Sequence, residues 1–205
     1  MVTTPAPTGN TYDKYGTANP IERRLMAGFF RALDRSLPVR PPTTVLEVGI
    51  GEGQVSARVR SRYRQASIVG VDLPDPARAA DWRERRLVGL FADITALPFP
   101  PGAFDLILAI EVLEHVDDPP AALAELARLG RGHLVLSVPR EPVWRLANMA
   151  RGKYLRALGN TPGHVQHWSR RGFADLVGSR FEVVDVHTPF PWTMVSARTR
   201  RPSPA

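Results

Sequence analysis

The spacing of apolar positions changes several times along the chain, and each change marks a predicted element. Residues 21–33 carry an apolar side chain at every fourth position, which is the spacing of one helix face. Asn19 and Pro20 suit the N-cap and first turn of that helix, and Pro38 lies beyond its end. The almost unbroken apolar run at 104–110 instead predicts a strand that is buried on both faces.

The alternation of these patterns predicts the fold class. Strands are expected at 44–48, 67–72, 87–93, 104–110 and 133–138, and helices at 53–63, 76–85, 119–129, 143–158 and 169–177. Buried strands separated by helices indicate a parallel sheet that is covered on both sides. The last two strands, 181–187 and 192–197, have no helix between them and predict an antiparallel hairpin. We therefore expect a three-layer α/β fold with a mostly parallel sheet of about seven strands.

Composition places this fold in a single globular domain. The chain has 205 residues, of which 43% are hydrophobic and 23% charged. Residues 1–18 are expected to form a flexible tail, 19–198 the domain, and 199–205 a basic C-terminal tail. The absence of cysteine excludes disulfides, thiolate metal sites and a cysteine nucleophile. We find no apolar run long enough to span a membrane and no secretory signal, so we expect a cytoplasmic protein.

The formal net charge of +7 and the pI of about 10.7 have two interpretations. The basic residues are almost all arginines and are spread along predicted helices, which is typical of a solvated surface. Alternatively, the charge attracts an anionic acceptor, a phospholipid headgroup or RNA. Charge alone does not decide between them.

The most informative segment is Val45-Leu-Glu-Val-Gly-Ile-Gly-Glu-Gly53, a strand followed by glycines and then a helix. Gly49 and Gly51 lack a Cβ, so the backbone can turn tightly and lie close to a ligand. The following helix directs its free N–H groups and positive dipole end at the same ligand. Asp72 ends the next strand, where its carboxylate can accept both hydroxyls of a ribose.

The spacing within this loop favours a ligand other than a dinucleotide. The dinucleotide fingerprint requires a glycine at position 54, which is Gln54 here. Glu47 stands two residues before the first glycine, where a carboxylate suits a ligand with a cationic ammonium group better than a pyrophosphate. The alternative is a strand-to-helix turn whose glycines have no binding role.

Together with later segments, the loop resembles a known family. The segments that carry the resemblance are Glu47–Gly53, Val71-Asp72, Phe91–Phe99, Phe104-Asp105 and Val112–Val116. They are similar to class I S-adenosylmethionine-dependent methyltransferases, closest to the small-molecule branch that includes the ubiquinone/menaquinone methyltransferases. The resemblance is good over about residues 44–138. It implies a Rossmann-like methyltransferase fold and S-adenosylmethionine (SAM) as cofactor, with S-adenosylhomocysteine as product.

The resemblance also implies which residues hold the cofactor. Glu47, Gly49 and Gly51 would surround the methionine part, and Asp72 and Leu73 would hold the ribose and lie against the adenine. The Asp93 carboxylate and the Ile94 N–H would meet the adenine, and Glu111 would approach the methionine part. The sequence leaves other roles open: Asp93 also suits a turn or cap at a strand end, and Glu111 need not touch the cofactor.

Histidines are the candidate catalytic bases. His115 follows the fourth strand, at the sheet edge where ligands gather. His164, His167 and Trp168 lie in a segment that faces the acceptor in related enzymes. Each has a structural alternative: a loop hydrogen bond for His115, a helix-entry bond for His167 and a core position for Trp168.

We expect no metal ion. Asp118 precedes Pro119 and suits an N-cap better than a metal site shared with Asp117 and His115. His164 and His167 have no evident third ligand nearby.

These features predict methyl transfer from SAM to a small-molecule or lipid- or glycan-linked acceptor, with oxygen favoured because histidines are the available bases. Residues 140–168 are expected to form a lid over the acceptor, and their basic amphipathic character suits contact with a membrane surface. The alternative is a helix packed on the domain. Tyr12 and Tyr15 could fold over the cofactor.

Two other functions remain open, an RNA or protein methyltransferase and a non-catalytic SAM-binding regulator. We expect no nucleic acid, because the fourth strand ends in Glu111-Val-Leu-Glu114 instead of the Asn/Asp-Pro-Pro-aromatic motif of similar nucleic-acid amino methyltransferases.

Overall fold

The computed structural model describes residues 19–150, 152, 154 and 157–200. The expected N-terminal tail with Tyr12 and Tyr15 lies outside the described residues, as do Arg151, Lys153, Arg156 and residues 201–205.

Seven strands form one sheet in the order β3-β2-β1-β4-β5-β7-β6. The parallel strands are β1 (Thr44–Val48), β2 (Ser67–Asp72), β3 (Val88–Phe91), β4 (Phe104–Ile110) and β5 (Gly130–Pro139). The expected antiparallel pair is also present, with β7 (Trp192–Thr199) lying between β5 and β6 (Phe181–His187). The predicted three-layer α/β fold is confirmed. Because the strand order reverses between β1 and β4, ligands are expected at the carboxyl ends of these strands.

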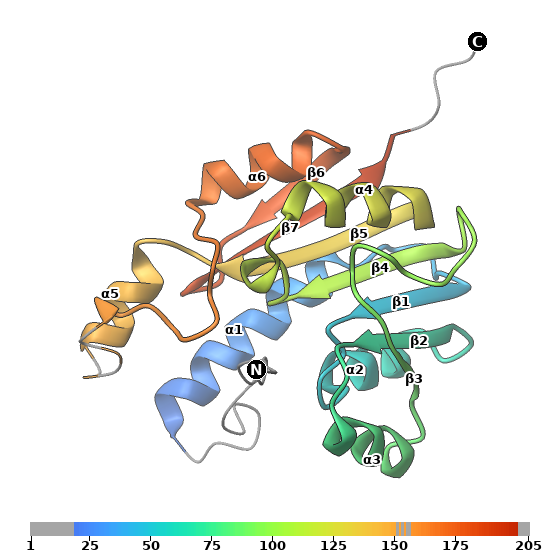
Figure 1. Ribbon diagram of the computed structural model, residues 1–205, viewed down its shortest axis with the longest axis horizontal. Helices are drawn as coiled ribbons and strands as arrows, with labels where there is room; N and C mark the ends of the chain where they lie inside the picture. The colour runs from blue at the N-terminus through green and yellow to red at the C-terminus, as the bar shows by residue number, and fades with distance from the viewer. Residues whose placement is uncertain (1–18, 151, 153, 155–156, 201–205) are drawn as a thin grey trace, which may run out of the picture.

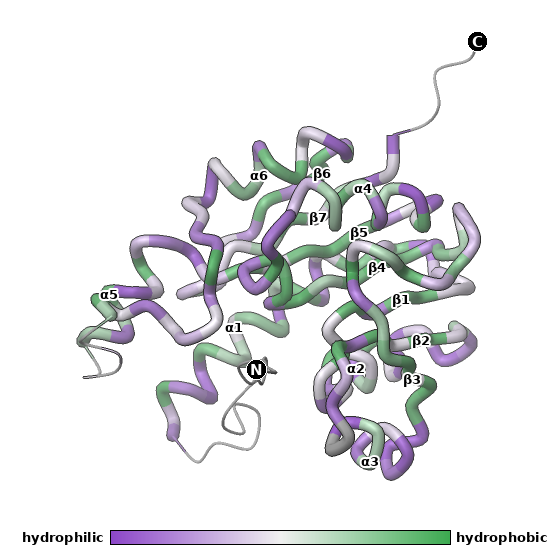
Figure 2. The backbone as a smooth tube through the Cα atoms, in the orientation of Figure 1, coloured by the Kyte–Doolittle hydropathy of each residue, from purple (hydrophilic) through white to green (hydrophobic). Residues whose placement is uncertain are grey.

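Helices cover both faces of the sheet (Figure 1). On one face, α1 (Pro20–Ser36) and α2 (Gln54–Arg62) share a buried apolar cluster with Leu106 and Leu108 of β4. On the other, α4 (Pro119–Leu129) and α6 (Arg170–Gly178) share a cluster with Ile107 and Ala109 of the same strand. Successive β4 residues therefore face opposite layers, as expected for a strand buried on both sides. Figure 2 shows the apolar positions concentrated along the central strands.

Side-chain caps fix three helix starts. The Asn19 side chain accepts a hydrogen bond from the Ile21 N–H at 2.9 Å, and Asp118 accepts one from the Ala121 N–H at 3.0 Å. Ser169 caps α6 in the same way. The capping role predicted for Asn19 and Asp118 is confirmed. Two further helices are α3 (Pro76–Glu84), next to β3, and the short 3₁₀ helix η1 (Leu113–His115).

The helix predicted at 143–158 is wrong in its second half. The observed α5 (Val143–Ala150) ends before Gly152, whose φ is 68°, and Tyr154 and Leu158 also have positive φ angles. A right-handed helix cannot contain such residues. The chain instead turns back on α5, where the Asn148 side chain donates a hydrogen bond to the Gly159 carbonyl at 2.9 Å. Figure 1 places α5 beyond the carboxyl end of β5.

Three strands also differ from their predicted bounds. β7 runs two residues further than expected, to Thr199. β3 is shorter than expected at both ends, and at its C-terminal end the chain leaves the sheet before a turn at Asp93. β5 begins at Gly130, which is also the C-cap residue of α4, so no loop separates this helix from the strand.

Candidate active site

A tight glycine loop joins β1 to α2 at the carboxyl edge of the sheet. Gly49, Gly51 and Gly53 have φ angles of 70°, 50° and 78°, a region that favours glycine. A Cβ at Gly49 would lie 2.3 Å from a Val112 side-chain carbon, and one at Gly53 2.0 Å from a Leu87 side-chain carbon. A Cβ at Gly51 would meet no atom of the described residues within 4 Å. The loop is thus packed against the protein on both sides of Gly51, where a ligand can approach the backbone.

Asp72, the last residue of β2, lies beside this loop. Its Oδ2 accepts a hydrogen bond from the Gly51 N–H at 2.8 Å, and its Oδ1 accepts one from the Leu73 N–H at 2.8 Å. Each carboxylate oxygen can accept more than one hydrogen bond, so these contacts leave capacity for ribose hydroxyls. The structure therefore brings Asp72 and the exposed Leu73 next to the glycine loop, while their contacts with a cofactor stay a prediction.

Glu47 lies beneath the loop and is only 2% exposed. Its carboxylate accepts a hydrogen bond from the Ser56 hydroxyl in the first turn of α2. Burial raises the pKa of Glu47 to about 8, while the hydrogen bonds from Ser56 oppose the rise and the negative charge of Asp72 adds to it. Glu47 therefore ties β1 to the start of α2, and this contact holds the two ends of the loop together.

A turn at Asp93 follows β3. Asp93 Oδ1 accepts hydrogen bonds from the Thr95 N–H at 2.8 Å and from the Thr95 hydroxyl at 2.6 Å. These bonds lower the pKa of Asp93. The turn that the sequence left open is thus present, and contact with an adenine amino group stays a prediction. The Ile94 side chain is buried in the core, so any role in binding falls to its backbone N–H.

An aromatic pair beside β3 was not predicted from the sequence. The rings of Trp82 and Phe91 lie 5.0 Å apart, and the Trp82 indole N–H donates a hydrogen bond to the Gly51 carbonyl at 2.8 Å. A Cβ at Gly89 would lie 2.3 Å from the Trp82 ring, so the ring packs directly on the backbone of β3. The usable signal was a glycine within a strand, which often marks such a close approach.

Glu111 follows β4 with a φ of 58°, a rare conformation for a residue with a side chain. Its Oε1 accepts a hydrogen bond from the Ser137 hydroxyl at 3.1 Å, and its Oε2 accepts one from the Trp192 indole N–H at 2.7 Å. The carboxylate is therefore oriented by residues from β5 and β7. Sequence analysis missed Trp192, because its contact with Glu111 spans 81 positions.

Two of the three candidate histidines meet. The rings of His115 and His164 lie edge to face with centroids 4.9 Å apart. His115 Nδ1 lies 2.9 Å from the Gly163 carbonyl, which only accepts hydrogen bonds, so Nδ1 carries the proton and the lone pair of a neutral ring is on Nε2. The exposed His167 instead lies 2.8 Å from the Asn160 side-chain oxygen through Nε2. His115 and His164 thus form one group that excludes His167.

The flat wall beside these histidines comes from a different tryptophan than expected. Trp144 of α5 stacks on His164, with ring centroids 6.1 Å apart, and lies 5.9 Å from the Trp192 ring. Trp168 is partly buried and packs on Phe173 of α6 at the edge of the core, close to the structural alternative proposed. Sequence analysis missed Trp144, because it predicted a helix over 143–158 without giving this residue a role.

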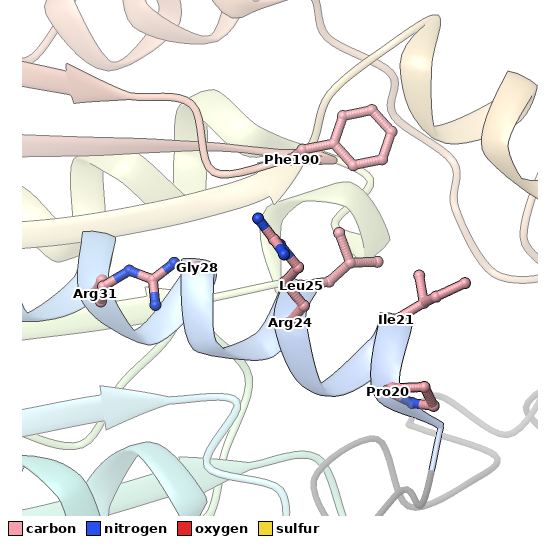
Figure 3. Close-up of a pocket in the computed structure, with 7 residues that line it drawn as sticks. All are labelled: Pro20, Ile21, Arg24, Leu25, Gly28, Arg31 and Phe190. Carbon is pink, nitrogen blue, oxygen red and sulfur yellow. The ribbon is translucent and has the colours of Figure 1, made fainter.

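A hollow of about 470 Å³ lies between α1 and the turn before β7 (Figure 3). Six residues of α1 line it together with Phe190. Ile21 and Phe190 are 69% and 52% exposed, and the guanidinium groups of Arg24 and Arg31 come from the same helix. Phe190 is two residues from Trp192, so one turn contributes to both the hollow and the aromatic wall.

Comparisons with known proteins identify the family. A family model described as a methyltransferase domain matches residues 21–184. The chain is 40% identical over 106 residues to malonyl-[acyl-carrier protein] O-methyltransferase of Halorhodospira halophila, across 48% of this chain and 35% of that protein. It is 33% identical over 120 residues to demethylmenaquinone methyltransferase of Thermus thermophilus, across 55% of this chain and 54% of that protein. The matches span about a third and about half of these curated relatives' own lengths.

Solved structures show the same fold. One chain of the complex between the Haloferax volcanii Trm112 methyltransferase activator and a methyltransferase has a TM-score of 0.71 at 18% identity, across 88% of this chain and 92% of that one. A SAM-dependent methyltransferase from Aquifex aeolicus has a TM-score of 0.68 at 15% identity, across 89% of this chain and 94% of that one. Among the described helices, none is long and apolar enough to cross a membrane. Because the family match extends over most of its length, this chain belongs to the class I S-adenosylmethionine-dependent methyltransferases.

Proposed function

We propose that this chain transfers a methyl group from SAM to an oxygen atom of a small-molecule or lipid- or glycan-linked acceptor. One observation carries the proposal: two groups of residues lie beyond the carboxyl ends of strands of the same sheet. The first is the glycine loop with Asp72, and the second consists of His115, His164 and Trp144. Methyl transfer depends on aligning donor and acceptor and on excluding water. A cofactor held at the glycine loop, with an acceptor held against the aromatic and imidazole side chains, would meet both needs.

The residues of the cofactor side fit SAM, which supplies a methyl group on a positively charged sulfur. The backbone at Gly51 is open to a ligand, and a Cβ there would occupy that space. We expect Gly49 and Gly51 with Glu47 to hold the methionine part, and Asp72 with Leu73 to hold the ribose and adenine. The Asp72 carboxylate beside this loop complements the positive charges of the ligand better than it would a phosphate.

The remaining cofactor contacts are proposed on the same basis. The Asp93 turn and the Ile94 N–H lie after β3, next to the exposed Phe91 ring, where they would meet the adenine. Glu111, oriented by Ser137 and Trp192, would approach the methionine part from β4.

The acceptor side supports oxygen as the methylated atom. A hydroxyl must lose its proton as it is methylated, and a base contributes about 10²- to 10⁴-fold to such a step. The His115 tautomer places a lone pair on Nε2, and the His164 ring meets the same ring. The flat Trp144 and Trp192 rings would exclude water around the acceptor. The hollow beside α1, with apolar and arginine side chains, supports an acceptor that carries a lipid or an anionic group.

The test is transfer of label from methyl-labelled SAM to a panel of phenolic, carboxylic and glycosidic hydroxyl acceptors and to a lipid extract. We expect label on oxygen, recognised by mass spectrometry of the product, and its loss in Asp72→Ala. Asp175→Ala, an exposed aspartate of α6 that pairs with Arg171, is the matched control. Label on nitrogen or carbon would contradict O-methylation. Tight SAM binding with no transfer to any acceptor would favour the non-catalytic regulator.

A further inference from the structure

Three side chains of the metal-binding type meet on the acceptor side. Glu114 and His115 belong to η1, and His164 comes from the segment that follows α5. Each offers one ligand atom, and the three atoms lie within 4.8 Å of one another. Bonds from a metal to nitrogen or oxygen of about 2.0–2.2 Å place ligand atoms about 3–4 Å apart, so shifts of about 1 Å would close the group around an ion. We propose that Glu114, His115 and His164 bind a divalent transition-metal ion.

The backbone holds the two segments together around this group. The N–H groups of Val165 and Gln166 both donate to the Glu114 carbonyl oxygen, at 2.9 and 3.1 Å. Main-chain bonds from the two residues that follow His164 therefore hold this segment against Glu114 before any ion is bound. A cation site that is formed in advance needs less ordering when the ion arrives.

The histidine rings have the supports that metal ligands use. His115 donates from Nδ1 to the Gly163 carbonyl at 2.9 Å, which leaves Nε2 as the atom suited to a metal. Histidines that bind metals commonly donate their other ring N–H to a carbonyl or carboxylate in this way. His164 stacks on Trp144, whose indole N–H donates to the Thr161 hydroxyl at 2.9 Å and so fixes that ring.

The ligand types indicate which ions suit this group. Glu114 is only 1% exposed, so an ion bound to its carboxylate would lie inside the protein rather than on its surface. Two nitrogen ligands and one oxygen ligand favour zinc, manganese or iron(II) over magnesium or calcium, which prefer oxygen ligands.

The role of the ion rests on the proposed function. Three protein ligands leave coordination positions for an acceptor oxygen, whose pKa a bound cation lowers. The O–H bond then breaks and its proton passes to water. The oxygen forms a bond to the methyl carbon as the carbon–sulfur bond breaks, and that electron pair stays on sulfur as the donor becomes S-adenosylhomocysteine. With His115 Nε2 bound to the ion, the ion would activate the hydroxyl in place of the histidine base described under the proposed function.

The experiment measures metal binding directly, without cofactor or acceptor. The chain, carrying no histidine tag, is stripped with a chelator, dialysed and titrated calorimetrically with Zn²⁺ and Mn²⁺. We expect one ion per chain, bound at least tenfold more weakly by Glu114→Gln, His115→Asn and His164→Asn. The matched controls are Glu182→Gln and His187→Asn, which remove the same groups from β6 and should bind as the wild type does.

Circular dichroism checks that each variant folds. If Glu114→Gln does not fold, His164→Asn, which changes a partly exposed ring, decides the outcome. The proposal is wrong if the wild type binds neither Zn²⁺ nor Mn²⁺ with a Kd below about 100 μM. It is also wrong if the ligand variants bind the ion with the affinity of the wild type. S-adenosylhomocysteine binding is titrated separately. A chain that binds this ligand but no metal would overturn the metal site alone, and a chain that binds metal but not this ligand would overturn the proposed function alone.

Discussion

The Asp72 carboxylate accepts a hydrogen bond from the Gly51 backbone N–H across 2.8 Å. This contact joins the end of β2 to the loop that follows β1, and the strands β1 and β2 themselves pair in parallel. The residue expected to bind the ribose therefore also positions the loop expected to hold the methionine part. We expect changes at either residue to weaken binding of the whole cofactor, rather than of one portion of it.

Gly51→Ala should weaken S-adenosylhomocysteine binding by at least tenfold with only a small loss of stability. The new Cβ meets no described atom within 4 Å, so it projects into the space proposed for the ligand. The left-handed backbone costs about 1 kcal/mol for a residue with a Cβ. Calorimetric titration and thermal unfolding measure the two effects separately.

Gly102→Ala is the matched control for that change. Gly102 has a φ of 66°, and a Cβ there also meets no described atom within 4 Å, but it precedes β4 at the opposite edge of the sheet. It should lose similar stability and keep full affinity. Equal affinity losses in the two variants would contradict the proposed position of the ligand.

Glu47→Gln should remove a pH dependence of stability. Because the pKa of Glu47 is raised from 4.5 to about 8, the folded chain keeps this proton where the unfolded chain has lost it. Stability therefore falls as the pH rises from about 4.5 to about 8, and stays reduced above that range. Glutamine keeps an oxygen for the Ser56 hydroxyl but carries no charge. The variant should be more stable than the wild type at pH 9, by on the order of a few kcal/mol, and nearly equal at pH 4.5.

Urea unfolding at pH 4.5, 7 and 9 measures this difference. Parallel pH profiles for the wild type and Glu47→Gln would show that Glu47 is ionised in the folded chain.

Asp105→Asn should destabilise the sheet at neutral pH. The Arg131 guanidinium lowers the pKa of Asp105 to about 2; burial opposes this shift, and the N–H groups of Thr43 and Thr44 add to it. This stabilisation is complete above pH 3.8 and is lost as the pH falls through about 2. Because the Arg131 side chain is 52% exposed, we expect the free energy of unfolding to fall by about 1 kcal/mol at pH 7.

Chemical unfolding of Asp105→Asn between pH 7 and 2.5 should show the difference from wild type shrinking toward acid. Asp175→Asn, at an exposed ion pair with Arg171, is the control and should change stability little. A difference that stays constant down to pH 2.5 would argue against the lowered pKa.

Trp192→Phe should weaken S-adenosylhomocysteine binding by about tenfold. In the wild type, the Trp192 ring lies 5.1 Å from the Phe29 ring, and its indole N–H donates to the Glu111 carboxylate at 2.7 Å. Phenylalanine retains a ring against Phe29 but removes the N–H that orients Glu111. A lost hydrogen bond to a charged group is worth about 1.5–3 kcal/mol, part of which other contacts replace. Calorimetry measures the affinity, with Trp168→Phe at the edge of the core as control. Unchanged affinity would mean that Glu111 does not bind the cofactor.

Local patterns predicted most of the fold. The strands at 44–48, 67–72, 104–110 and 181–187 have the observed bounds, because each is an apolar or β-branched run followed by turn residues. The predicted helix after β5 failed because apolar spacing continues past Ala150, whereas Gly152 and the contact of Asn148 with the Gly159 carbonyl turn the chain back.

The site was less predictable on the acceptor side. The glycine loop and Asp72 lie in one strand–helix–strand unit, so their proximity follows from local order. The meeting of His115 with His164 depends instead on main-chain bonds between segments about 50 positions apart. No local pattern shows that Glu114 joins them, because its burial follows from the packing of η1 against other elements.

The most direct test of the whole account is calorimetric titration of S-adenosylhomocysteine into the wild type and Asp72→Ala. We expect the wild type to bind one molecule per chain, Asp72→Ala to bind at least tenfold more weakly while remaining folded, and Asp175→Ala to bind as the wild type does. A wild-type chain that binds none, or an Asp72→Ala variant with unchanged affinity, would contradict a cofactor site at the glycine loop.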